Sequence, residues 1–188
     1  RDALTGGGAY PAAWIALDRA ANDGADFESS GFPPDLEARL RSHFDEGGTV
    51  PCAARADLSG GITVIPAGSK CDDCPGSSGQ VAETRLVARL SDDRGRIGSI
   101  HASLPPGRDA DPDECRLFRE LAEAVAIGVS QLRDRAADRR EKDRYRALLD
   151  ALPHPISLVD RKYRYAMVND AYLRTYQKPR SEIEGRLV

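Results

Sequence analysis

The residues with the clearest capacity for chemistry are three cysteines. Cys71 and Cys74 form a Cys-X-X-Cys motif, and Cys52 lies nineteen residues before it. Two intervening residues allow both sulfurs to reach one metal ion or to exchange a disulfide. A structural zinc site normally has four ligands, so Cys52 would be the third and a His, an Asp or a water the fourth. Three interpretations stay open: loop cysteines without a chemical role, a thiol redox sensor, or ligands of a metal ion such as zinc.

The histidines and the tryptophan are the other candidates. The three histidines show no HxxxH or HExxH spacing, so we predict structural roles for them. His101 falls within a predicted strand, and a pocket residue or haem ligand is its alternative role. Trp14 lies in an apolar run and is expected in the core, with a pocket wall as the alternative. The candidate pocket residues are therefore Trp14 and His101, the ligand is unknown, and haem and flavin stay open.

Short apolar runs separated by turn residues predict the elements that position these side chains. A strand is predicted over 9–17, a return strand over 26–32, and a helix from Pro33 to Gly47 with Leu36, Leu40 and Phe44 on one face. Residues 49–79 are predicted to be rich in loops. A confident antiparallel hairpin covers 84–104. In its first strand Leu86, Ala88 and Leu90 alternate with Arg85, Val87 and Arg89, which predicts one buried and one wetter face.

A long helix is predicted from Asp113 to Leu152, because no helix breaker interrupts it. Its apolar residues follow a heptad spacing through Phe118, Ala122, Val125, Val129, Leu132 and Ala136. We interpret the helix as a parallel dimeric linker between two domains, with a solvated terminal helix as the alternative. Acids interleave with the bases of 133–146, which disfavours nucleic-acid binding.

The charge balance also predicts two units. The net charge is −3, but residues 1–132 carry 13 basic and 21 acidic side chains, whereas residues 133–188 carry 14 and 9. A change of sign of this size favours a junction near 130–150. No run approaches 18 apolar residues, so we expect no membrane span, and four cysteines suit a reducing, cytoplasmic compartment. The start at Arg1, without a leader, is expected for a piece of a longer protein.

Two segments resemble known families. The order of elements up to residue 132, with the phrases Ala13-Trp-Ile-Ala-Leu17 and Phe118-Arg-Glu-Leu-Ala-Glu-Ala-Val-Ala126, resembles a GAF domain. Tyr145-Arg-Ala-Leu-Leu-Asp-Ala-Leu-Pro153, Ile156-Ser-Leu-Val-Asp160 and Val168-Asn169 are similar to the entry of a PAS domain. The predicted parts are a GAF-like sensor over 1–112 lacking most of its first helix, a terminal and coiled-coil linker helix over 113–152, and the start of a PAS-like domain over 153–188.

The resemblance implies an α+β fold: an antiparallel sheet with flanking helices, a long C-terminal linker helix and a partial PAS-like βα unit. It also implies a small-molecule pocket, a homodimer through the linker helix, and a sensory role in a bacterial signalling protein. The output domain, in cis, would be a histidine kinase or a diguanylate cyclase, and the fragment itself is expected to be no enzyme.

The alternative function uses the same fold class. Free-methionine sulfoxide reductases resemble GAF domains with catalytic cysteines on loops, so Cys52, Cys71 and Cys74 would be the candidate thiols. Turnover of methionine sulfoxide that disappears in Cys74→Ser would favour this enzyme over a pure sensor. A metal-binding structural module is the other alternative.

Overall fold

The structure is a computed structural model that describes residues 10–19, 25–69, 74–75 and 82–188. The chain forms two compact units, which we call unit 1 (up to Ser130) and unit 2 (Gln131–Val188). The predicted division at 112 and 152 stays a prediction. None of the described helices combines the length and the apolar character that a membrane crossing needs.

Unit 1 is built on a five-stranded antiparallel sheet with the strand order β2-β1-β5-β4-β3. The strands are β1 (Ala12–Asp18), β2 (Ala25–Ser30), β3 (Ile62–Ile65), β4 (Arg85–Asp92) and β5 (Gly95–Ser103). Both predicted hairpins, β1–β2 and β4–β5, are present. The α+β class with an antiparallel sheet and flanking helices is confirmed.

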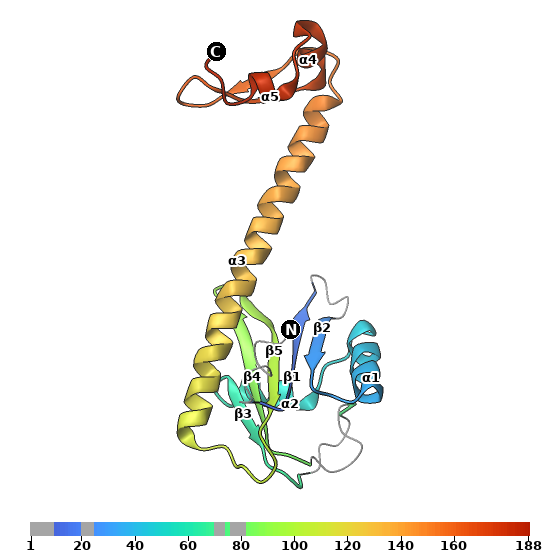
Figure 1. The fold of residues 1–188 in the computed structure, drawn as a ribbon, viewed down its shortest axis with the longest axis vertical. Helices are drawn as coiled ribbons and strands as arrows, with labels where there is room; N and C mark the ends of the chain where they lie inside the picture. The colour runs from blue at the N-terminus through green and yellow to red at the C-terminus, as the bar shows by residue number, and fades with distance from the viewer. Residues whose placement is uncertain (1–9, 20–24, 70–73, 76–81) are drawn as a thin grey trace. The chain divides into compact units, whose positions relative to one another are not determined.

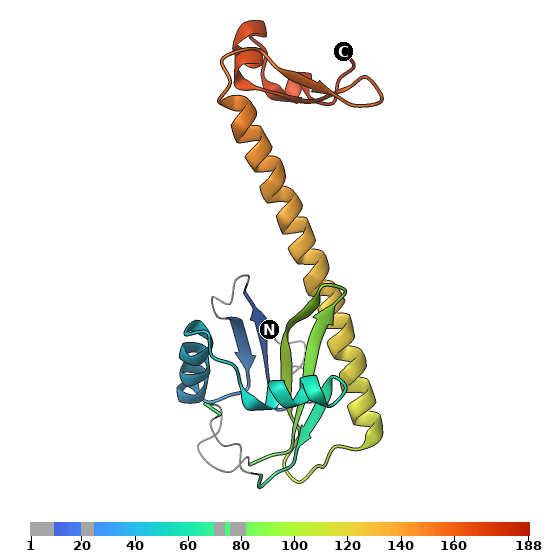
Figure 2. The same cartoon turned by 180° about the vertical axis from the view of Figure 1, so that it is seen from behind.

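Helices cover both faces of this sheet (Figures 1 and 2). Helix α1 (Pro34–Asp45) and helix α2 (Pro51–Leu58) pack on one face, and the first half of helix α3 (Pro112–Asp150) packs on the other. Pro34 occupies the first turn of α1, where its missing N–H costs no hydrogen bond. Leu40 and Phe44 are buried and Leu36 packs against them, as their spacing predicts.

Two predictions about this unit need correction. Residues 49–79 were predicted to be rich in loops, yet α2 lies among them. Its buried residues, Cys52, Ala53 and Ala56, are small, so the helix packs closely on the sheet. The second face of β4 is also less wet than predicted, since Val87 is fully buried in the cluster formed with α1 and α2.

The first half of the heptad seam, which was predicted to contact a partner helix, packs on the sheet of unit 1. Phe118 and Ala122 are buried in the chain's own core, and Val125 and Val129 pack against the same cluster with Leu86 and Ile100. These positions therefore contact the sheet of unit 1. Leu132, one step further along the seam, is 64% exposed.

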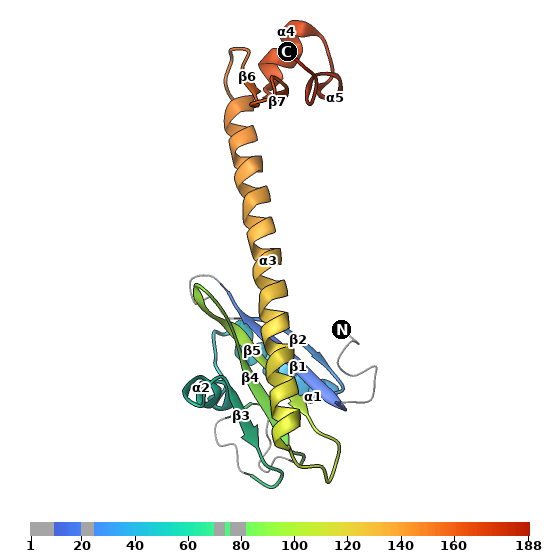
Figure 3. The ribbon, with the colours of Figure 1, turned by 90° about the vertical axis from the view of Figure 1, so that its left-hand side faces the viewer.

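Unit 2 contains the end of α3, the antiparallel pair β6 (Ser157–Val159) and β7 (Tyr165–Val168), and the helices α4 (Asp170–Tyr176) and α5 (Arg180–Ile183) (Figure 3). This order agrees with the predicted strand, turn, strand and helix. The helix α3 ends at Asp150, two residues before the predicted end, and is 39 residues long.

A single buried side chain joins the elements of unit 2. Asn169 is fully buried. Its amide nitrogen lies 2.9 to 3.4 Å from three carbonyl oxygens, and its oxygen accepts hydrogen bonds from two backbone N–H groups. The carbonyls belong to Leu149, Leu152 and His154, and the N–H groups to Ile156 and Tyr172. Asn169 therefore satisfies the C-terminal carbonyls of α3, the entry of β6 and the N-terminus of α4 at once.

Arg180 adds a charged contact to the same junction. Its guanidinium lies 3.4 Å from the carboxylate of Asp150 in α3, 2.9 Å from Asp170 and 3.3 Å from Glu184. It also donates to the carbonyl of Val168 at 2.6 Å. The last turn of α3 is thus connected to both short helices of unit 2.

We expect Asn169→Ala to lower the stability of unit 2 by about 2 to 4 kcal/mol, because two buried N–H groups lose their acceptor and α4 loses its cap. Hydrogen exchange of the Ile156 and Tyr172 amides should accelerate by more than about tenfold. Lys178→Ala, at an exposed position of the same unit, is the control and should change neither amide. Unaltered exchange in Asn169→Ala would show that the junction does not depend on this side chain.

Candidate functional site

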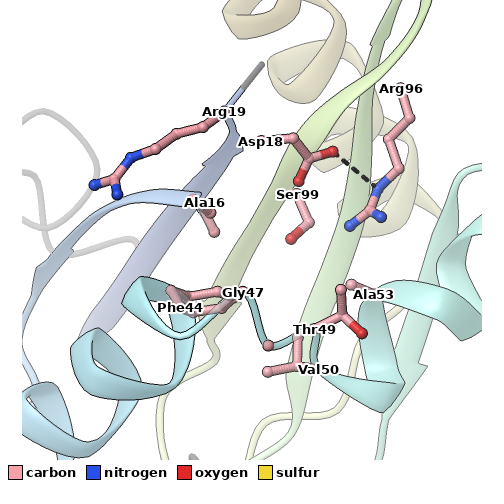
Figure 4. Close-up of a pocket in the computed structure, with 12 residues that line it drawn as sticks. Ala16, Asp18, Arg19, Phe44, Gly47, Thr49, Val50, Ala53, Arg96 and Ser99 are labelled. Atoms are coloured by element: carbon pink, nitrogen blue, oxygen red, sulfur yellow. Dashed lines mark ion pairs between the residues drawn. The ribbon is translucent and has the colours of Figure 1, made fainter. Parts of the chain in front are cut away.

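A cavity of about 220 Å³ lies on the α1–α2 face of the unit 1 sheet (Figure 4). Asp18, Arg96 and Ser99 lie on one side of it, and Ala16, Phe44 and Val50 form an apolar part of its wall. Ligand pockets for drug-sized molecules usually measure roughly 300–1,000 Å³, so this cavity suits a molecule smaller than haem or flavin.

The register of the central strands places these side chains. Trp14, Ala16 and Asp18 alternate along β1 and therefore point to the same face. Ala16 lies opposite Ser99 in the β1–β5 pair, which brings the hydroxyl group to the cavity. The loop from Gly47 to Val50, between α1 and α2, closes another side.

That loop is held by close packing. A Cβ atom at Gly48 would overlap the imidazole ring of His43 in its present position. The His43 ring contacts the carbonyl oxygen of Thr49 through Nε2 at 3.0 Å. A larger residue at position 48 would therefore require the His43 ring to move.

Charges of both signs line the cavity. The Nε atom of Arg96 lies 3.7 Å from a carboxylate oxygen of Asp18, with both side chains about one third exposed (31% and 40%). Arg19 is held by Asp26 at 2.8 Å and by Asp45 at 3.5 Å. The polar side of the cavity thus presents a carboxylate and a guanidinium next to each other.

The predicted pocket residues Trp14 and His101 lie together beside this cavity but do not line it. They are opposite each other in the β1–β5 register, and their rings stack with centroids 3.4 Å apart and an interplanar angle of 13°. Phe27 and Phe44 pack on Trp14. Trp14 is therefore primarily a core residue.

Both ring nitrogens of His101 have partners. Nδ1 lies 3.8 Å from the sulfur of Cys52, and Nε2 lies 3.2 Å from the hydroxyl of Ser99. Burial, assisted by the positive charges of Arg85 and Arg96, holds the pKa of His101 well below its ordinary value, so the ring is neutral. An iron ligand at His101 would first have to lose one of these contacts. Ser99 connects the ring to the cavity.

Of the three candidate cysteines, the structure describes Cys52 and Cys74. Cys52 and Cys74 are buried in one apolar cluster with Trp14, whereas Cys71 lies outside the described residues. Within the parts of the chain that the structure describes, no three His, Cys, Asp or Glu side chains are grouped to hold a metal ion. The zinc, redox and enzymatic interpretations of Cys52, Cys71 and Cys74 stay predictions.

Sequence reasoning missed Asp18, Arg96 and Ser99. The strand prediction ended at Leu17, one residue too early, so Asp18 was not recognised as continuing the alternation of Trp14 and Ala16. Extending the period of two by one residue would have found it. Arg96 and Ser99 carry no comparable signal, because only the pairing of β1 with β5 brings them to Asp18.

Of the two resemblances, the one to a PAS domain is also found by comparison with a family model. Residues 143–188 match the family model of the PAS domain. This match confirms the PAS resemblance for that segment. No curated protein matches the chain.

Among solved structures, the chain is similar to a chain of the E. coli DhaR(N)–DhaL complex, with a TM-score of 0.49 and 19% identity. The match covers 100% of this chain and 63% of that one. It is also similar to the second GAF domain of DevS from Mycobacterium smegmatis (TM-score 0.49, 16% identity, 74% and 91% covered). A third similar structure is the GAF domain from an Acinetobacter phosphoenolpyruvate-protein phosphotransferase (TM-score 0.46, 12% identity, 66% and 74% covered).

The neutral state of His101 makes the stability of unit 1 depend on pH. Below about pH 6.5 the unfolded chain binds a proton at this residue that the folded chain does not, so the free energy of unfolding should fall as pH decreases, by up to about 1.4 kcal/mol per pH unit. Urea unfolding between pH 7.5 and 5.5, followed by the fluorescence of Trp14, the one tryptophan of the chain, measures this slope.

His101→Gln should flatten the slope, whereas His154→Gln, at an exposed position, should keep it. Equal slopes in the wild type and His101→Gln would contradict a neutral, buried His101.

Proposed function

We propose that this chain is the sensory part of a signalling protein, in which a small molecule binds the cavity of unit 1 and helix α3 carries the response. The observation that carries the proposal is the cavity itself, with Asp18, Arg96 and Ser99 on one side and apolar residues on another. The PAS match of residues 143–188 supports it, because the PAS resemblance implies a sensory role.

The central strands provide the physical link from the cavity to α3. On β5, Ser99 faces the cavity, while the next residue, Ile100, packs in the cluster that contains Phe118 of α3. A ligand that moves β5 changes the packing of α3, because a close-packed core does not deform on one side alone. The response requires that the ligand bind two arrangements of unit 1 with different affinity.

In this proposal the chain is not catalytic. It acts in the cytoplasm, and its output is a domain in cis, a histidine kinase or a diguanylate cyclase. The chain works as a homodimer whose contact is α3 beyond Ser130. Residues 131–150 are exposed around most of the helix within unit 2, and a helix without a buried face needs a partner. Leu132, Tyr145 and Leu148 are its large exposed apolar residues.

A defined panel tests the sensor: the twenty amino acids, cyclic mononucleotides and short carboxylic acids, each added separately while Trp14 fluorescence reports thermal unfolding. At 100 times its Kd a ligand stabilises the folded state by about 2.7 kcal/mol, a shift of several degrees in Tm. The same compound should change hydrogen exchange in residues 131–150.

The matched variants are Ala53→Leu, which fills the cavity, and Ala54→Leu, at the next and exposed position of α2. We expect the first to lose the shift and the second to keep it. A panel without any shift, or an equal shift in Ala53→Leu, would argue against the proposed site.

The dimer has its own test. Leu132→Asp should convert the dimer to a monomer in light scattering without loss of helicity, because a charge in a helix seam is costly to bury. Gln131→Asp, at the neighbouring exposed position, is the control and should remain dimeric. A wild-type chain that is strictly monomeric at high concentration would rule out the helix contact.

A further inference from the structure

The cavity has two chemically different sides. Asp18, Arg96 and Ser99 form the polar side, and Figure 4 shows Asp18 and Arg96 facing each other with Ser99 next to them. Apolar atoms of Phe44 and Val50 lie across the cavity. A ligand that fills this space therefore needs a charged or polar end and an apolar body.

Asp18 and Arg96 form the charged contact at the polar end, while Arg19, which also lines the cavity, is paired with Asp26 and Asp45. The separation of 3.7 Å between nitrogen and oxygen is longer than a charge-assisted hydrogen bond, which usually measures about 2.7–2.9 Å. Both side chains are also partly exposed, so they are accessible from solvent.

A ligand with one charge fits this end poorly. An anion bound to Arg96 would lie beside the Asp18 carboxylate, and a cation bound to Asp18 would lie beside Arg96. Like charges placed this close reduce affinity. A ligand that carries an ammonium group and a carboxylate on one carbon atom meets both partners with the correct sign. The α-amino acids have this arrangement.

The volume restricts the apolar body. A volume of about 220 Å³ lies below the roughly 300–1,000 Å³ of pockets for drug-sized ligands, so the ligand is small. This space accepts an aliphatic side chain of leucine's size against Phe44 and Val50. Glycine would leave the apolar wall without contacts.

We propose that the cavity binds an α-amino acid with an aliphatic side chain, its ammonium group on Asp18, its carboxylate on Arg96 and its side chain on Phe44 and Val50. This inference rests on the proposed function and names the ligand class of the same site. Ser99 is adjacent to the bound head group and contacts His101, so it is the residue through which occupancy reaches the core.

Calorimetry on the full chain tests the proposal with three compounds that share the isobutyl group of leucine. L-Leucine carries both charges, 4-methylpentanoate lacks the ammonium group, and 3-methylbutylamine lacks the carboxylate. We expect leucine to bind, and each single-charge analogue to bind at least about tenfold more weakly, since each leaves one charged partner without its contact. Glycine should also bind more weakly than leucine, because it leaves the apolar wall without contacts.

Variants of the chain supply the second comparison. Asp18→Asn and Arg96→Gln should each weaken leucine binding at least about tenfold. Arg116→Gln removes an arginine from an exposed ion pair with Asp113 and Glu120 on α3, and it should leave the affinity unchanged. The emission of Trp14 verifies that each variant is folded.

The outcomes separate the two proposals. Equal binding of leucine and its analogues, or leucine binding unaffected by Asp18→Asn and Arg96→Gln, overturns the amino-acid assignment. If leucine does not bind but another compound of the panel raises Tm in the wild type and not in Ala53→Leu, the assignment fails and the sensor proposal stands. If no compound binds, both fail.

Discussion

The pairing of β1 with β5 is the constraint on which unit 1 depends. These two strands are central in the sheet, and every residue of β5 after Arg96 is buried. Their approach is close at Gly98, where φ is +156° and a Cβ atom would overlap the carbonyl oxygen of Ala16. Because Ala16 and Ser99 are opposite each other, the same register that closes the sheet also places the polar groups of the cavity.

Because side chains alternate along the paired strands, the two faces of the sheet carry different groups of residues. Helices α1 and α2, the cavity and the Trp14–His101 stack lie on one face of the sheet, and the first half of α3 packs on the other. A neutral histidine is compatible with such burial only when both nitrogens have partners, and Cys52 and Ser99 provide them. The chain of contacts from Cys52 through His101 ends at Ser99, which lines the cavity. The cavity is therefore connected to the buried core through side-chain contacts.

Much of the fold could be predicted from the sequence, because it depends on local periodicity. The β4–β5 hairpin, α1 and the extent of α3 follow from alternating or helical spacing. Helix α2 could not, since eight residues with small side chains carry too little periodic signal. The cavity could not either. Asp18 and Arg96 are 78 positions apart in the numbering, and only long-range strand pairing brings them within 3.7 Å.

The heptad interpretation of α3 shows why a correct pattern can have two meanings. Spacings of 3.5 and 3.6 residues per turn differ by only about 20° per heptad, so a short seam fits a partner helix and a flat sheet equally well. The sheet covers Phe118 to Val129, whereas Leu132, the next seam residue, is exposed. At its other end α3 is not free to rotate independently, because Asn169 and Arg180 attach its last turn to β6, α4 and α5. A rotation of the end of α3 would therefore act on β6, α4 and α5 through the contacts of Asn169 and Arg180, together with those of Arg146 and Asp150.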